Sequence, residues 1–412
     1  MLRSRFTATL IALVALVGLG AQGQPRREAG RRPGRAQQAV RPWSGPPGGY
    51  HPLAWQRWGP GAQRGATLGP IENTQHPGVG YGTAASAEAL DELVRLGCTW
   101  VSFTPFGRQW NLRSTAISLR FEAPFEANRA AVLRVMAQAH ARGLRVFLIP
   151  HLWVDMGGWR GEIEPGSPDG WRRWFASYTR FVTAWARVAE EGRAEMFSLG
   201  VELKSSSGTQ GAWFDVIDAV RREYHGLLTY SANWGEEADV IFWDRLDLVG
   251  IQAFYPLTER EGADLDTLRA GAQQRARDLA AWSARVGRPV LFAEYGYTAR
   301  RDPALRPWEW PDDMTDVVVD ETAQALAYRA LLEAFVGQPW FAGAYVWRYY
   351  ANPMDASQEA DWGFSPRLRP AEDVIRALYD PRLRWGSDPE PDPFTWALPA
   401  SGAQNSSAGP RP

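Results

Sequence analysis

The chain has 412 residues, of which 45% are hydrophobic and 22% charged, a composition typical of globular proteins. Its 45 Lys and Arg balance 46 Asp and Glu, which argues against a nucleic-acid binder that relies on a strong positive field. The single cysteine, Cys98, excludes an intrachain disulfide and a multi-cysteine metal site, whereas 21 tryptophans offer many flat apolar faces of the kind on which sugar rings stack.

The N-terminus has the pattern of a secretory signal over residues 1–23. Arg3 and Arg5 precede a short apolar run at 10–19, and small residues at 21–23 suit a cleavage site. The run is too short to span a bilayer comfortably, so we expect a cleaved signal rather than an uncleaved anchor. We therefore expect a secreted or periplasmic protein, with no membrane span after the signal is removed and no cysteine for lipid attachment.

Composition divides the remaining chain into three parts. Residues 24–75 are rich in Arg, Pro and Gly and have no apolar period, so we expect a mostly disordered leader. Residues 386–412 repeat this composition and predict a disordered tail. Residues 76–385 are left as one domain, which has the size of a single barrel.

Within 76–385, apolar runs of strand length alternate with amphipathic helical patterns. Helical patterns cover 86–96, 126–142, 168–192, 209–225, 266–286 and 320–337. Eight runs predict strands, at 79–81, 100–103, 146–149, 197–201, 228–230, 248–251, 290–293 and 344–347. Eight such units predict a closed (β/α)8 TIM barrel. An open doubly wound sheet is the alternative, but the glycines at 78–82 lack the spacing of a phosphate-binding turn.

A barrel of this kind carries its chemistry where the strands end. Two predicted strands, the fourth and the seventh, run directly into a glutamate, Glu202 and Glu294. A carboxylate directly after an apolar strand is costly to bury unless it has a partner, and one such residue could simply pair with an arginine. Two of them, on opposite sides of the barrel mouth, fit a retaining glycosidase, whose two carboxyl groups stand about 5–5.5 Å apart.

Other polar and aromatic residues follow the strands and are candidates for sugar binding. The third strand leads to His151 and Trp153, and Trp159 lies in the loop beyond them. Asn233 follows the fifth strand, although it could instead cap the turn after it. Tyr255 follows the sixth strand and Trp347 ends the eighth.

Six segments make the chain resemble glycoside hydrolase family 113. They are Trp159-Arg-Gly-Glu162-Ile, Trp174-Phe-x-x-Tyr178, Phe197-Ser-Leu-Gly-Val-Glu202-Leu, Tyr230-Ser-Ala-Asn233-Trp234, Asp247-Leu-Val-Gly-Ile-Gln-Ala-Phe-Tyr255-Pro and Phe292-Ala-Glu294-Tyr-Gly-Tyr297. The resemblance covers about 76–380. It implies a clan A barrel and a retaining endo-β-1,4-mannanase.

The resemblance also implies individual roles. Glu202 matches the acid/base and Glu294 matches the nucleophile. Tyr255 matches a tyrosine that hydrogen-bonds the nucleophile, and Trp347 matches the tryptophan that forms the floor of the sugar subsite. The wider clan has Asn before the acid/base, but this chain has Val201. Either His151 or Asn233 could therefore hold the sugar 2-hydroxyl, so the identity of the polysaccharide stays open.

The predicted function is thus a secreted, monomeric glycoside hydrolase that acts on a β-linked polysaccharide and needs no cofactor or metal. Glucan and xylan are alternative substrates to mannan. A non-catalytic sugar-binding barrel would also use many tryptophans, but it does not need two opposed acids. A metal hydrolase lacks a recognisable ligand cluster in the sequence.

Overall fold

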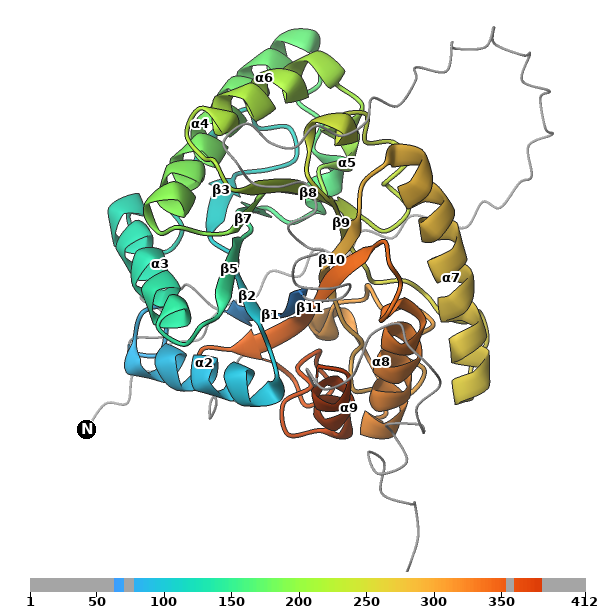
Figure 1. The fold of residues 1–412 in the computed structure, drawn as a ribbon. Coiled ribbons are helices and arrows are strands. Elements are labelled where there is room, and N and C mark those ends of the chain that lie inside the picture. Colours follow the sequence, from blue (N-terminus) through green and yellow to red (C-terminus); the bar gives the residue numbers. More distant parts are fainter. Residues whose placement is uncertain (1–62, 70–77, 353–358, 380–412) are drawn as a thin grey trace, which may run out of the picture. The chain divides into compact units, whose positions relative to one another are not determined.

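The computed structural model describes residues 63–69, 78–352 and 359–379, which form a closed barrel of parallel strands. Around the barrel the strands follow their order along the chain, so that the last one pairs with the first (Figure 1). They are β1 (Gln63–Gly69), β2 (Trp100–Phe103), β5 (Arg145–Leu148), β7 (Met196–Val201), β8 (Leu227–Asn233), β9 (Val249–Gln252), β10 (Val290–Tyr295) and β11 (Phe341–Tyr350). The predicted (β/α)8 barrel is confirmed.

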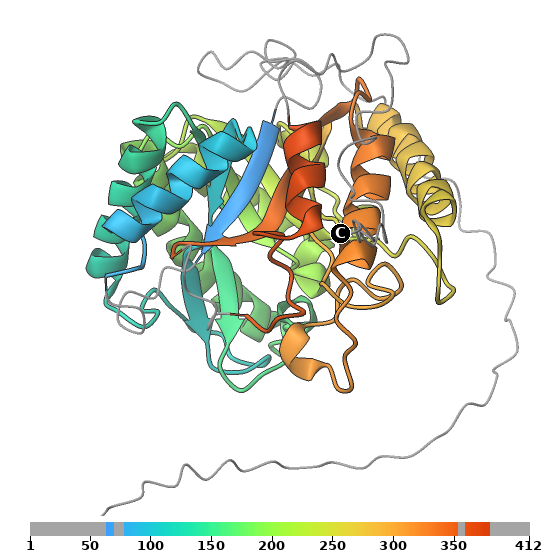
Figure 2. The same ribbon diagram turned by 90° about the horizontal axis from the view of Figure 1, so that it is seen from below.

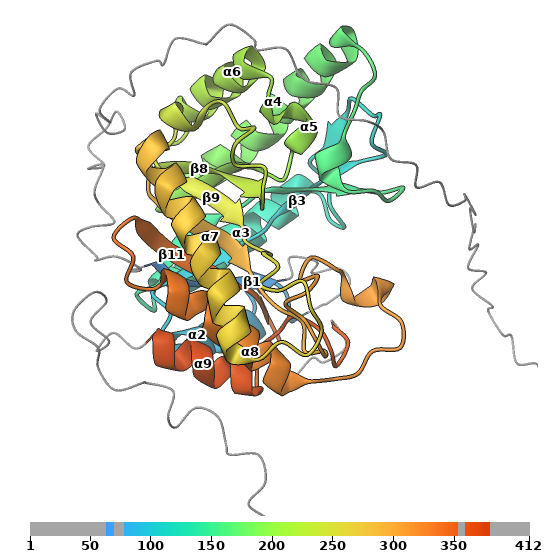
Figure 3. The ribbon, with the colours of Figure 1, turned by 90° about the vertical axis from the view of Figure 1, so that its right-hand side faces the viewer.

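Helices surround this barrel (Figure 1). The six predicted helical patterns correspond to α2 (Ala84–Leu96), α3 (Phe125–His140), α4 (Pro168–Glu191), α6 (Gln210–Arg221), α7 (Leu265–Val286) and α8 (Glu321–Phe335). Two shorter helices, α5 (Lys204–Ser207) and α9 (Pro370–Leu378), were not predicted. Figure 3 shows α7 and α8 side by side on the outside of the barrel.

Local signals set the ends of these helices. Thr83 caps α2, because its side-chain oxygen accepts a hydrogen bond from the backbone N–H of Ser86. Gly97 ends the same helix in the left-handed conformation, with φ of 98°, as expected of a glycine just before a strand. Ser167 caps α4 in the same way as Thr83 caps α2, and Pro168 takes the first helical position, where a missing N–H costs nothing.

The core has two layers, one on each side of the strands. Inside the barrel lies a fully buried cluster that includes Trp100, Phe147, Leu291 and Tyr345. A larger apolar layer fills the space between the strands and the helices. Because the strands are covered on both faces, they read as continuous apolar runs in the sequence, which explains why most of them could be predicted.

The first strand was predicted wrongly. Residues 79–81 form turns, and glycines with positive φ lie on both sides, with φ of 80° at Gly78 and 76° at Gly82. The true first strand, β1, lies in the range 24–75 that we assigned to the leader. The barrel therefore begins before residue 76.

Polar side chains explain why β1 was missed. Gln63 is fully buried inside the barrel, where its side-chain oxygen accepts a hydrogen bond of 3.0 Å from the hydroxyl of Tyr345. Thr67 is also buried and shares a hydrogen bond of 2.8 Å with Ser102. These hydrogen bonds compensate for the burial, so a strand with polar residues can occupy the core.

A small three-stranded sheet stands beside the barrel and was not predicted. Its order is β4 (Ile117–Ser118), β3 (Phe106–Gln109) and β6 (His151–Val154). In Figure 2 its teal strands lie at the same end of the barrel as the orange loop that follows β10 and carries the short helix η3 (Pro311–Asp313). These two segments flank the barrel mouth.

The expected signal at 1–23 and the expected tail at 386–412 lie outside the described residues. Most of the expected leader at 24–75 lies outside them too. Among the helices that the structure describes, none is both long enough and apolar enough to cross a membrane.

Candidate active site

Glu202 stands directly after β7, in a backbone conformation that is rare for a residue with a side chain. Its φ is 54°, and its N–H donates a 2.8 Å hydrogen bond to the carbonyl of Ser231 on the neighbouring strand β8. Such conformations persist only where the surroundings enforce them, and they are frequent at functional sites. The carboxylate accepts a 3.2 Å hydrogen bond from the indole N–H of Trp159 and lies 3.9 Å from Nε of Arg160.

Glu294 lies within β10 and is almost completely buried, with 5% of its side chain exposed. On the adjacent strand Gln252 pairs with it in register, and a hydrogen bond from the Gln252 side chain favours the ionised carboxylate. Nε2 of His151 lies 3.2 Å from Oε1 of Glu294. This short contact does not have hydrogen-bond geometry, and Oε1 has no hydrogen-bonding partner among the described residues.

His151 lies between Glu294 and two aromatic rings. The imidazole is parallel to the indole of Trp347, with 6.3 Å between centroids and 5° between planes, and it meets the ring of Phe106 edge-on at 5.1 Å. Burial, helped by the nearby charges of Arg160 and Arg348, holds the pKa of His151 well below its ordinary value. The imidazole is therefore neutral at pH 7, with one ring nitrogen as donor and the other as acceptor.

Both carboxyl groups of the site have raised pKa values. Burial raises the pKa of Glu294 to about 8, although Arg160, Gln252 and Arg348 counteract it. Burial also raises the pKa of Glu202, against the opposing charge of Arg160, and the negative charge of Glu294 raises it further. The pair therefore shares Arg160 and retains at least one proton near neutral pH.

Several buried polar atoms of this site lack hydrogen-bonding partners among the described residues. They are both ring nitrogens of His151, Oε1 of Glu294 and Nη1 of Arg160. Unsatisfied buried polar groups are rare in folded proteins, because each costs about 1–3 kcal/mol. Several of them beside two carboxyl groups indicate a site that binds a polar ligand.

The remaining predicted residues lie at varying distances from the carboxyl pair. Asn233 ends β8, is partly buried and lines a cavity of about 810 Å³ together with Trp159. Trp153 lies two residues beyond His151 on β6, is half exposed and packs against Phe106 with 6.5 Å between ring centroids. Within the described residues, no contact joins Trp153 to either carboxyl group.

The hydrogen bond expected between Tyr255 and Glu294 is absent. The Tyr255 hydroxyl is buried and has no hydrogen-bonding partner among the described residues. Its ring packs between Trp234 and Phe292, at 6.3 and 6.1 Å. The reason is that β9 ends at Gln252, and the chain beyond it carries Tyr255 toward the outer layer where Phe292 lies.

Sequence reasoning missed two residues that contact the carboxyl pair. Gln252 is the polar last residue of an otherwise apolar strand, so the rule on strand ends could have found it once the strand was given its true end. Arg160 adjoins Trp159 and begins the short helix η1 (Arg160–Glu162), and only the folded segment shows that it approaches Glu202. Arg160 lies within the segment Trp159-Arg-Gly-Glu162 that carries the family resemblance, but nothing in the sequence indicates that its side chain approaches a carboxyl group.

A buried hydrogen-bond chain holds the backbone next to Glu202. The N–H of Leu203 donates to the hydroxyl of Tyr230 at 2.7 Å, and that hydroxyl donates to Oε1 of Glu236 at 2.9 Å. The other oxygen of Glu236 accepts from the N–H of Asn233 at 2.8 Å. Burial raises the pKa of Glu236 to about 7, while these hydrogen bonds oppose the rise. The chain ties the ends of β7 and β8 together.

We expect Tyr230→Phe to lower both stability and turnover. The change leaves the Leu203 N–H and Oε1 of Glu236 without their partner in a buried place, which costs about 1–3 kcal/mol of unfolding free energy. Because Leu203 follows Glu202, the acid loses its fixed backbone, and turnover should fall about 10-fold or more. Urea unfolding and steady-state kinetics measure the two effects.

Tyr224→Phe is the matched control for this prediction. The Tyr224 hydroxyl is also buried and donates a 2.8 Å hydrogen bond to the carbonyl of Ala194, just before β7 begins. Its loss should lower stability at the opposite end of the same strand and leave turnover within about 2-fold. Equal turnover in the two variants would show that the hydrogen bonds of Tyr230 do not position Glu202.

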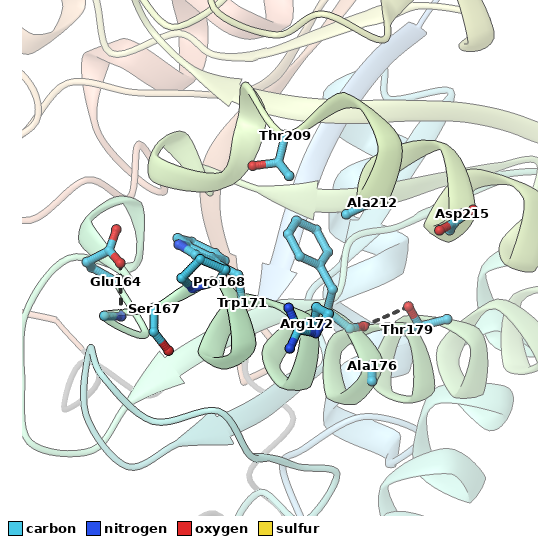
Figure 4. Close-up of a pocket in the computed structure, with 12 residues that line it drawn as sticks. Glu164, Ser167, Pro168, Trp171, Arg172, Ala176, Thr179, Thr209, Ala212 and Asp215 are labelled. Atoms are coloured by element: carbon cyan, nitrogen blue, oxygen red, sulfur yellow. Dashed lines mark hydrogen bonds between the residues drawn. The ribbon is translucent and has the colours of Figure 1, made fainter.

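A second cavity, of about 780 Å³, lies on the outer side of the barrel between α4 and α6. Figure 4 shows Trp171 and Pro168 on one wall and Thr209 and Ala212 on the other. None of the residues that contact Glu202 or Glu294 lines it. Although it is similar in size to the cavity beside Trp159, it is not part of the carboxylate site.

The chain has relatives of known structure. It is similar to a family 113 β-1,4-mannanase solved as a complex, with a TM-score of 0.66 and 26% identity over 77% of this chain and 99% of the other. A family 113 β-mannanase from Alicyclobacillus acidocaldarius is similar as well, with a TM-score of 0.65 and 28% identity over 77% and 96% of the two chains. A family 5 mannosidase from Rhizomucor miehei, 11% identical over 77% and 92% with a TM-score of 0.51, shares the fold. No curated protein matches the chain.

The family assignment rests on sequence as well as on structure. Residues 74–365 match the model of Glycoside Hydrolase Family 113, a range that includes seven of the eight barrel strands and both carboxyl groups. The resemblance seen in the sequence motifs is therefore confirmed. The chain belongs to glycoside hydrolase family 113 and is a glycosidase.

Proposed function

We propose that the protein is a secreted, monomeric, retaining endo-β-1,4-mannanase. The observation that carries this proposal is the pair of carboxyl groups at the ends of β7 and β10, a partly buried Glu202 and a buried Glu294, of which the negative charge of Glu294 raises the pKa of Glu202. Beside them, Oε1 of Glu294 and the ring nitrogens of His151 have no partner among the described residues. A sugar ring with its hydroxyl groups can satisfy these atoms.

In the first step Glu294 acts as the nucleophile. Its carboxylate oxygen attacks the anomeric carbon, and the bond from that carbon to the glycosidic oxygen breaks. Glu202 donates its proton to the departing oxygen, so the leaving sugar departs as a neutral alcohol. The product is a glycosyl ester of Glu294, with the configuration at the anomeric carbon inverted once.

In the second step Glu202, now ionised, accepts a proton from a water molecule. The oxygen of this water attacks the anomeric carbon, the ester bond breaks, and Glu294 is released as a carboxylate. The second inversion restores the original configuration. Glu202 is protonated again at the end, so both groups return to their starting states.

This cycle starts with one proton on the pair, and we assign it to Glu202. The raised pKa values of both groups retain a proton at neutral pH. Gln252, Arg160 and Arg348 favour a negative charge on Glu294, and that charge in turn favours a protonated Glu202. The apolar surroundings thus supply an acid, and the polar contacts around Glu294 support an ionised nucleophile.

Mannan is the substrate that the relatives favour. The similar family 113 structures are β-1,4-mannanases at 26% and 28% identity, and the alignments cover nearly all of their chains. His151 is the better candidate of the two residues for holding the sugar 2-hydroxyl, because its Nε2 lies 3.2 Å from Glu294. Asn233 lies instead with Trp159 along the cavity beside Glu202.

Two measurements test the proposed function. Purified protein should release reducing sugar from β-1,4-mannan faster than from glucan or xylan, and Glu294→Gln should abolish this release. Proton NMR during the first turnovers should show the β-anomer of the product before mutarotation. Binding of manno-oligosaccharides without any turnover would contradict the enzymatic proposal, and an initial α-anomer would contradict the retaining mechanism.

Secretion and oligomeric state have separate tests. If residues 1–23 are a cleaved signal, the protein recovered outside the cytoplasm begins near residue 24, which N-terminal sequencing detects. Light scattering should give the mass of one chain. A mature protein that still carries residues 1–23 would indicate an anchor instead.

A further inference from the structure

Four tryptophans line the 810 Å³ cavity beside Glu202. They are Trp159, Trp234, Trp308 and Trp310, from three different loops. Trp308 and Trp310 are 46% and 40% exposed, which is unusual for such large apolar side chains. The rings of Trp234 and Trp308 stack on each other, with 5.0 Å between centroids and 29° between planes, so the exposed part of Trp308 belongs to a supported aromatic surface.

Two routes connect this cavity to the catalytic carboxyl groups. Trp159 lines the cavity, and its indole N–H donates to Glu202. The second route runs through Arg348, whose positive charge acts on Glu294. Its guanidinium lies 4.8 Å from the ring centroid of Trp347 and 5.5 Å from that of Trp310, which lines the cavity. The cavity is therefore a direct extension of the active site.

The position of the cavity relative to the two acids indicates on which side of the scissile bond it lies. Trp159, which contacts Glu202, is one of its walls. The groups that contact Glu294, namely His151 and Gln252, do not line it. Since Glu202 protonates the leaving oxygen in the proposed mechanism, a cavity on its side faces the sugar that departs.

The loop that carries Trp308 and Trp310 is held in a defined shape. Glu309 lies 2.7 Å from Nη2 of Arg300 and 2.9 Å from Nε of Arg306, and thus bridges two arginines of the same loop. The carbonyl of Ala304 accepts a 2.9 Å hydrogen bond from the N–H of Leu257. Because the loop is already fixed, a ligand that stacks on Trp308 would not have to order it.

We propose that this cavity binds the sugars on the leaving-group side of the scissile bond, with Trp308 as their stacking platform. The proposal rests on the proposed function and adds to it that the preferred substrate places at least two sugars beyond the scissile bond, on the leaving-group side. The apolar C–H face of a sugar covers the exposed indole, while Asn233 and Arg306 offer a carbonyl oxygen and N–H donors to its hydroxyl groups. Binding energy from these remote sugars contributes to the chemical step.

The test compares two substrates that differ only in what occupies the leaving-group side. Mannohexaose places sugars there, whereas 4-nitrophenyl β-mannotrioside, assayed by nitrophenol release, places a single aryl group. Trp308→Ala should lower kcat/KM for mannohexaose 10- to 100-fold and leave nitrophenol release within 2-fold. Trp308→Phe, which keeps an aromatic face, should recover most of the loss.

Trp171→Ala serves as the matched control. Trp171 is a partly buried tryptophan on α4 that lines the outer cavity shown in Figure 4. Its removal should leave the ratio of the two kcat/KM values unchanged, whatever it does to stability. Thermal unfolding of all three variants shows whether any loss of activity reflects loss of folded protein.

The outcomes separate this proposal from the proposed function. If the unaltered protein cleaves neither substrate, the proposed function fails. If it cleaves both, and Trp308→Ala loses activity on neither or equally on both, only the assignment of the cavity to leaving-group sugars is overturned. A selective loss on mannohexaose, recovered by Trp308→Phe, supports it.

Discussion

Replacing Glu202 by alanine should lower mannan hydrolysis about 10²- to 10⁴-fold, the usual contribution of a general acid. The loss should depend on the leaving group, because a dinitrophenolate leaves without a proton whereas a sugar alkoxide does not. With a dinitrophenyl glycoside the glycosyl-enzyme should form readily and then accumulate, since no base remains to activate water. Stopped-flow release of dinitrophenol measures both phases.

Azide gives this prediction a second readout. A small anion that needs no deprotonation can occupy the space left by the Glu202 carboxylate and attack the anomeric carbon in place of water. Activity of Glu202→Ala on the dinitrophenyl glycoside should therefore recover, with a β-glycosyl azide as the product. Glu162→Ala, which removes an exposed carboxylate from the nearby helix η1, is the control and should retain activity within about 2-fold. An α-glycosyl azide from Glu202→Ala would contradict these assignments, because it would indicate that Glu202 is the nucleophile and Glu294 the acid/base.

Glu294→Gln should lose at least 10⁴-fold in turnover, because an amide of the same shape cannot form the glycosyl ester. The same variant should be more stable than the unaltered protein at high pH. Burial makes the ionised carboxylate unfavourable in the folded state, so removal of its charge relieves a cost that function imposes. Loss of activity together with a gain in stability is the result expected of a catalytic group.

The pH dependence of that stability has a definite sign. The ordinary pKa of Glu294 is 4.5, and in the folded protein it is about 8. Between these values the folded carboxyl pair, Glu202 and Glu294, retains a proton that the unfolded state has lost, so the free energy of unfolding falls as pH rises from about 4.5 to 8. Glu294→Gln lacks this loss. Its free energy of unfolding should be higher than that of the unaltered protein by roughly 2–4 kcal/mol at pH 9, and by little at pH 4.

Urea unfolding at several pH values measures this difference. Glu162→Gln, an exposed position, should show no such growth in stability between pH 4 and pH 9. A constant difference between Glu294→Gln and the unaltered protein across this range would mean that the folded carboxyl pair does not retain a proton that the unfolded state loses. The raised pKa of Glu294 would then be wrong.

Seven of the eight barrel strands could be predicted, because strands covered on both faces leave continuous apolar runs in the sequence. The exception, β1, is informative. Gln63, Arg64 and Thr67 interrupt its pattern, and their suitability for the barrel depends on partners such as Tyr345, which is 282 residues from Gln63 in sequence. Apolar periodicity cannot detect a strand whose polar side chains form hydrogen bonds with such remote residues.

The candidate site was predictable to the extent that strand ends define it. Glu202, His151 and Glu294 stand at or just beyond apolar runs, and the barrel topology alone predicts that such positions share one opening. Arg160 lies in the short helix η1 and Trp308 in a loop, and no periodicity reveals the shape of either segment. Tyr255 shows the limit of a resemblance, because the motif is present but the structure shows no hydrogen bond from its hydroxyl to Glu294.

Covalent trapping tests most directly which carboxylate becomes the glycosyl ester. A 2-deoxy-2-fluoro-mannosyl fluoride slows both steps but retains an excellent leaving group, so the intermediate should accumulate and add one sugar to the mass of the protein. Peptide mapping by mass spectrometry should then find the sugar on the peptide that contains Glu294, with no labelling of Glu294→Gln. A sugar attached to Glu202, or full activity on mannan in a protein that never acquires the label, would contradict the account.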